Sequence, residues 1–67
     1  MNYNKLKEIR KDRGYTQDFI AEKMGYSNKS SYSMLETGRV KVDLEKAKRL
    51  KIILDLSDGE FEEIFLS

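Results

Sequence analysis

The 67-residue chain contains no cysteine, histidine, proline or tryptophan, and these absences narrow what the protein can be. Without cysteine it forms no disulfide, and without cysteine and histidine it lacks the usual zinc ligands. The carboxylates have no partner bases in motif spacing, and no glycine-rich phosphate loop is present, so we do not expect an enzyme. A small domain without disulfides fits the reducing cytoplasm. We therefore expect a cytoplasmic protein with no metal, cofactor or small-molecule ligand.

Long apolar runs are also missing. No run approaches the roughly 20 residues needed to span a bilayer, and the N-terminus lacks the apolar stretch of a signal peptide. With 37% charged residues, the chain is expected to be soluble and to have no membrane partner. Its length predicts a single domain over residues 1–67 with a small core, because a chain of this size buries only roughly 60% of its unfolded surface.

Charge is distributed unevenly along the chain. Residues 1–54 hold all 13 Lys and Arg side chains and seven acidic ones, a net charge of +6. Residues 55–67 hold five acidic side chains and no basic one, a net charge of −5. A basic body with an acidic tail suggests two surfaces with different partners, although a charge-balanced soluble protein would also fit.

The segments between the glycines have helical length, and β-branched runs are scarce, so the pattern predicts an all-α domain of five helices. The expected helices run from about Asn4 to Arg13, over residues 17–24, over about 29–36, from an N-cap at Asp43 to about Leu54, and from a cap at Ser57 or Asp58 onward. Leu44, Ala47, Leu50 and Leu54 share one face of the fourth helix. Phe61, Ile64 and Phe65 form the apolar face of the last, where Leu66 follows them.

Residues 17–36 have the outline of a helix-turn-helix. Thr16 is a good N-cap for the first of the two helices, and Gly25 ends it. In this motif the second helix lies in the DNA major groove. The polar run SNKSSYS, residues 27–33, is therefore interpreted as the start of a recognition helix rather than a linker, since small side chains allow close approach to base edges.

The sequence resembles the Cro/repressor family of phage and bacterial helix-turn-helix regulators, which have the lambda-repressor-like fold. The resemblance rests on LKEIRKDRGYTQ at 6–17, FIAEKMG at 19–25, SYSMLETGR at 31–39 and the acidic-aromatic end at 58–65. It implies a compact five-helix domain that binds double-stranded DNA as a homodimer on a two-fold symmetric operator. One departure is that the segment after Gly25 is one residue longer than usual, which the turn Tyr26-Ser27-Asn28 is expected to absorb.

Residue roles follow from this resemblance position by position. Arg10 and Glu36 match a structural ion pair between the first and third helices. The candidates for reading bases are Lys29, Ser30, Ser31, Ser33 and Met34. The candidates for contacting phosphates are Gln17, Asn28, Arg39, Lys41 and Arg10.

A second hypothesis is a protein-interaction module of the same fold, such as an antitoxin or anti-repressor component. A DNA-binding protein should gather Lys29, Arg39 and Lys41 with Gln17 on one surface. A protein-binding module should instead expose an apolar patch, for which the terminal Phe61, Ile64, Phe65 and Leu66 are candidates. These terminal residues could equally close the core and contribute to a dimer contact.

Overall fold

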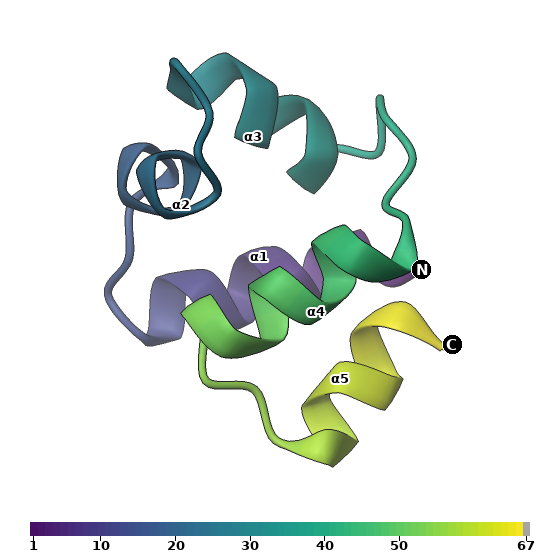
Figure 1. Cartoon of the computed structure of the whole chain (residues 1–67). Coiled ribbons are helices and arrows are strands. Elements are labelled where there is room, and N and C mark those ends of the chain that lie inside the picture. Colours follow the sequence, from purple (N-terminus) through teal and green to yellow (C-terminus); the bar gives the residue numbers. More distant parts are fainter. Residues whose placement is uncertain (67) are drawn as a thin grey trace.

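The computed structural model describes residues 1–66 and contains five α-helices in that range, with no strand (Figure 1). The helices are α1 Tyr3–Asp12, α2 Gln17–Lys23, α3 Lys29–Glu36, α4 Leu44–Ile53 and α5 Asp58–Phe65. The predicted all-α, five-helix fold is confirmed. No helix in the described part of the chain has the length and apolar character to cross a bilayer.

Each helix begins at a side chain that accepts a hydrogen bond from the backbone of its first turn. Thr16 and Asp43 cap α2 and α4 as the sequence predicted. At α5 the cap is Ser57 rather than Asp58, because Ser57 and Glu60 form a reciprocal capping box. The expected start of α1 at Asn4 was one residue late, because Asn2 Oδ1 accepts from the Lys5 N–H at 3.0 Å and starts the helix at Tyr3.

The core is built from buried side chains of all five helices and of the connection between α4 and α5. Its members are Leu6, Ile9, Ile20, Ala21, Met24, Tyr32, Leu35, Leu50, Leu54, Leu56 and Ile64. Ala47 is also buried, but Leu44, which was predicted to share its face, is 64% exposed. Leu44 is the first residue of α4 and lies beyond the edge of the core. Phe61 and Phe65 are only half-buried, which leaves part of their rings at the surface of α5.

Candidate nucleic-acid interface

The helix-turn-helix consists of α2, a turn at residues 24–28 and α3. Gly25 adopts a left-handed conformation with φ of 81°, which favours glycine, and the Tyr26 N–H donates to the Ala21 carbonyl at 2.9 Å. Asn28 is the N-cap of α3, where its Oδ1 accepts from the Ser30 N–H at 2.9 Å. The residues Tyr26-Ser27-Asn28 thus form the extended turn, and α3 occupies the predicted range.

The two faces of α3 differ in chemistry. Its inner face buries Tyr32, Leu35 and Glu36, which fixes how the helix is rotated about its axis. Among the five candidates for reading bases, Lys29, Ser30 and Met34 are exposed. Ser31 and Ser33 are half-buried at the edges of this outer face. The candidates therefore differ in exposure, and three of the five are exposed on α3.

Thr37 also lies on the exposed side of α3, and the sequence interpretation missed it. It is the C-cap residue, and its hydroxyl donates to the Ser33 carbonyl at 2.8 Å. The helical repeat could have identified it, because position 37 is one turn beyond 33 and two turns beyond 30. Its hydroxyl is engaged with the helix backbone, so the side chain offers mainly its methyl group and an acceptor.

The exposed side chains of residues 28–41 include three cations and no carboxylate. Asn28, Lys29, Arg39 and Lys41 are all exposed, and within residues 1–66 none of these three cations has a carboxylate partner. Glu36 is the only acidic residue of the segment, and it is 4% exposed. Cations elsewhere are often neutralised locally, as in Arg13–Glu60, Lys46–Asp43, Arg49–Glu45 and Lys51–Asp58. We call residues 28–41 the basic face.

A buried ion pair holds the end of α3 against α1. Arg10 Nε lies 3.0 Å from Glu36 Oε1 and 3.2 Å from Oε2, and the two side chains are 8% and 2% exposed. The Arg10 guanidinium also donates to the Tyr15 carbonyl at 2.7 Å. Arg10 was predicted to contact a phosphate as well, and that role stays a prediction. Its guanidinium lies in the interior and is occupied by protein acceptors.

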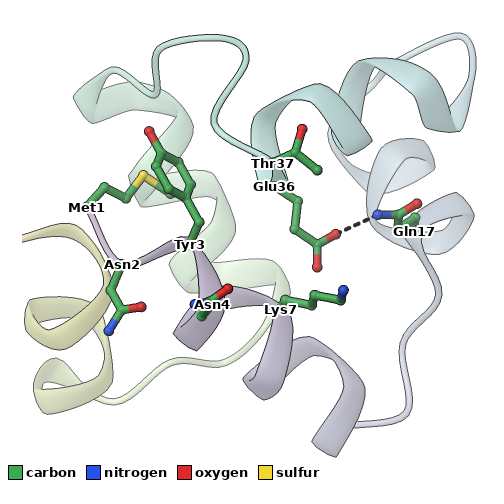
Figure 2. A pocket seen from close by; sticks show the side chains of 8 residues that line it. All are labelled: Met1, Asn2, Tyr3, Asn4, Lys7, Gln17, Glu36 and Thr37. Atoms are coloured by element: carbon green, nitrogen blue, oxygen red, sulfur yellow. Dashed lines mark hydrogen bonds between the residues drawn. The ribbon is translucent and has the colours of Figure 1, made fainter.

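Gln17 extends this network to α2. Its Nε2 donates to Glu36 Oε2 at 2.8 Å. The side chain of Gln17, which was predicted to contact a phosphate, is therefore held by the buried ion pair. Figure 2 shows Gln17 and Glu36 in the wall of a polar cavity whose other sides come from α1 and from the end of α3. Tyr3, Lys7 and Thr37 also line this cavity, which we call the α1–α3 notch. Sequence patterns gave no sign of it, because its walls are far apart in the chain.

Tyr32 brings a polar atom into the core beside the ion pair. Its hydroxyl is buried and has no hydrogen-bond partner in the described residues. Burial raises the pKa of this phenol above its ordinary value, and the negative charge of Glu36 raises it further. The nearby Arg10 acts in the opposite direction and does not overcome the other two effects. Tyr32 therefore stays neutral and serves α3 as a packing residue.

Two short helices packed across a glycine turn, with exposed cations at the start of the second and in the loop after it, define a helix-turn-helix domain. The model of the family described as Helix-turn-helix matches residues 6–61, and the chain belongs to this family, the Cro/C1 (XRE) type. It is thus a helix-turn-helix protein of a DNA-binding, regulatory kind. No curated protein and no solved structure matches the chain.

Proposed function

We propose that the protein is a sequence-specific transcriptional regulator, of repressor type, which places α3 in the major groove of a two-fold symmetric operator. The observation that carries this proposal is the basic face, where Lys29, Arg39 and Lys41 are exposed without carboxylate partners. A surface that exposes cations and no anion attracts the phosphate backbone, which supplies most of the sequence-independent affinity for DNA.

Roles on the basic face follow from position and exposure. Lys29, Ser30 and Met34 would meet base edges, with Ser31 and Ser33 closer to the groove wall. Lys29 can donate to guanine O6 and N7, and Met34 can contact a thymine methyl group. Asn28, Gln17, Arg39 and Lys41 would contact phosphates and so fix the orientation of α3 without reading sequence.

The acidic α5 supports the same docking direction. Figure 1 shows α3 and α5 at opposite ends of the molecule. Asp58, Glu60, Glu62 and Glu63 all belong to α5, and close to DNA their charges would be repelled by phosphates. When a duplex is bound along the basic face, these carboxylates lie far from its phosphates.

The proposed regulator acts as a homodimer, since a two-fold symmetric operator requires two copies of α3 about one helical turn apart. An apolar groove at the start of α4 and the end of α5 supports this part of the proposal. Its apolar lining includes Val42, Ala47, Phe61 and Phe65, together with Leu44 and Leu66, which are 64% and 71% exposed. Apolar side chains exposed together at one place indicate a protein contact.

The same groove favours the second candidate function, a protein-interaction module with no specific DNA target. The deciding experiment selects the purified protein against a random-sequence duplex library at near-physiological salt. Enrichment of a two-fold symmetric motif is the expected result for the dimeric regulator. If no motif is enriched and the protein binds DNA only weakly, in a way that salt abolishes, the protein is better explained as a protein-interaction module.

A further inference from the structure

The loop between α3 and α4 carries two of the exposed cations, and its backbone is held at few points. The Arg39 N–H donates to the Met34 carbonyl at 2.8 Å, and the Gly38 N–H donates to the Leu35 carbonyl at 3.2 Å. These two bonds end α3 in a Schellman motif. Residues 40–42 make no hydrogen bond or ion pair in the described part of the chain. The path of the loop therefore depends on packing.

The Tyr3 ring packs against the start of this loop. A Cβ atom on Gly38 would lie 3.0 Å from two ring carbons of Tyr3 and 3.4 Å from a third. Gly38 also has a φ of 82°, a left-handed conformation that favours glycine. Figure 2 shows the Tyr3 ring between the start of α1 and the chain that leaves α3 after Thr37. Glycine at position 38 thus permits the turn and also lets the ring approach the backbone.

The backbone that carries the Tyr3 ring is itself fixed. Tyr3 is the first residue of α1, and the N-cap Asn2 accepts a hydrogen bond from the Lys5 N–H at 3.0 Å. The Asn2 N–H donates to the Ile64 carbonyl at 2.7 Å, which joins the start of α1 to α5. The ring therefore stands on a backbone held from two sides and forms a firm wall for the loop.

The loop connects this wall to the proposed phosphate contacts. Arg39 and Lys41 are exposed, and neither has an ion-pair partner among residues 1–66. Ordering a long side chain and its loop on binding reduces affinity, and a loop that is already ordered avoids part of that loss. A ring that fixes the start of the loop therefore raises affinity without touching DNA.

We propose that Tyr3 is a positioning residue for DNA binding, which acts through Gly38 to direct Arg39 and Lys41 toward the phosphate backbone. The inference rests on the proposed DNA-binding function and adds to it a residue of α1 that the sequence patterns did not connect with DNA. Phosphate contacts do not read sequence, so the contribution of Tyr3 is the same on every duplex.

The test compares the wild-type protein with Tyr3→Ala, which removes the ring, and with the matched control Tyr3→Phe, which removes only the hydroxyl. Fluorescence anisotropy at near-physiological salt measures binding to the duplex from the library selection and to a shuffled duplex of equal composition. Tyr3→Ala should bind both duplexes about three- to tenfold more weakly, the cost of ordering one or two long side chains. Tyr3→Phe should bind like the wild type. An equal loss in both variants would make the hydroxyl a direct contact and overturn the inference.

A double-mutant cycle separates positioning from a merely structural role. Tyr3→Ala is measured again in a protein that carries both Arg39→Ala and Lys41→Ala. The loss caused by Tyr3→Ala should nearly vanish in that background, because the loop has no cation left to direct. An undiminished loss would overturn the inference. Thermal melts give the folded fraction by which each affinity is corrected.

Hydrogen exchange of the free protein gives a readout that does not depend on DNA. The Arg39 amide should exchange faster in Tyr3→Ala, because a looser loop opens its bond to the Met34 carbonyl more often. The Met24 amide, which donates to the Ile20 carbonyl at 2.9 Å at the end of α2, is the internal control and should keep its wild-type rate. Equal acceleration of both amides would indicate a general loss of stability and overturn the inference.

Failure of the proposed function has a different signature. Wild-type protein that binds both duplexes equally would exclude sequence-specific regulation, and the double-mutant cycle on the shuffled duplex would still decide the role of Tyr3. Wild-type protein that binds neither duplex would overturn both proposals. The two failures are thus separated by the wild-type measurements.

Discussion

At the scale of single residues, the buried Arg10–Glu36 pair connects the end of α3 to α1. It connects positions 26 apart in the sequence, and both side chains are almost wholly removed from water. A pair of this kind adds little net stability over an apolar substitute, but loss of one member leaves the other charge buried without a partner. The pair therefore acts less as a source of stability than as a requirement for the position of α3.

Glu36→Gln should lower the free energy of unfolding by about 3 kcal/mol, because the Arg10 charge stays buried and loses its counter-charge. Glu45→Gln is the control, since its pair with Arg49 is exposed and such pairs contribute at most about 1 kcal/mol. Urea denaturation followed by circular dichroism measures both changes. Equal effects of the two substitutions would show that the buried pair has no special role.

The residue contacts were only partly predictable. Arg10 and Glu36 were paired through the family resemblance, since no local pattern connects residues so far apart. The Gln17–Glu36 hydrogen bond and the notch beside Lys7 depend on how three helices meet, and helical periodicity contains no information on that. The predicted phosphate role of Arg10 stays a prediction, and the resemblance that suggested it transfers residue identity without showing that the side chain is buried.

At the scale of secondary-structure elements, the proposed contacts with DNA come from two places, α3 and the loop that follows it. The start of α3 presents Lys29 and Ser30, whose position is fixed by the Asn28 cap. Arg39 and Lys41 follow the helix on an exposed segment that begins at the left-handed Gly38. The helix is suited to base contacts, whereas the loop is suited to backbone contacts.

Substitutions in α3 and in the loop after it should therefore have different effects on DNA binding. Arg39→Ala or Lys41→Ala should weaken binding on all sequences and reduce the salt slope by about 1, because a phosphate contact is lost. Lys29→Ala should relax base preference at particular positions and cost about 1–3 kcal/mol there. Binding assays over single-base variants of the selected duplex measure both effects. A uniform loss for Lys29→Ala would place its side chain on the backbone.

Element boundaries were predictable wherever a cap could be recognised in the sequence. Thr16, Asp43 and the glycines marked ends that the structure reproduces within a residue. The one residue assigned to the wrong environment, Leu44, reflects the way α4 meets the rest of the fold. Leu44 has the spacing of a core residue, but α4 begins at the margin of the core and leaves its side chain in solvent.

At the scale of the whole molecule, α5 is attached through polar contacts around one buried residue, Ile64. Arg13 lies 2.9 Å from Glu60, and Lys51 lies 2.7 Å from Asp58. The hydrogen bond from Lys51 lowers the pKa of Asp58. The backbone hydrogen bond at Ser57, followed by the contact with Arg13, lowers the pKa of Glu60. Both carboxylates are thus more acidic in the folded protein than in the unfolded chain.

Stability should therefore depend on pH in the acid range. A carboxylate whose folded pKa is lowered contributes stability above its unfolded pKa, about 4, and loses it as the pH falls through the folded value. We expect a constant Tm between pH 7 and 5 and a fall below about pH 4. Glu60→Gln should flatten that fall, while Glu62→Gln, on the same helix but with no ion pair in the described residues, should not. If Tm depends on pH in the same way in the two variants, Glu60 is not a cause of the fall in Tm at acid pH.

The unpaired cations of the basic face lie at the opposite end of the molecule from α5 (Figure 1), where Asp58 and Glu60 are paired with Lys51 and Arg13, so the positive end of the molecular dipole is at the basic face. In the field of a polyanion such a dipole experiences a torque, which turns α3 toward the polyanion before any contact is made. Productive encounters then form a larger share of all collisions than random orientation would allow. This orientation raises the association rate. Added salt screens the field and would lower that rate.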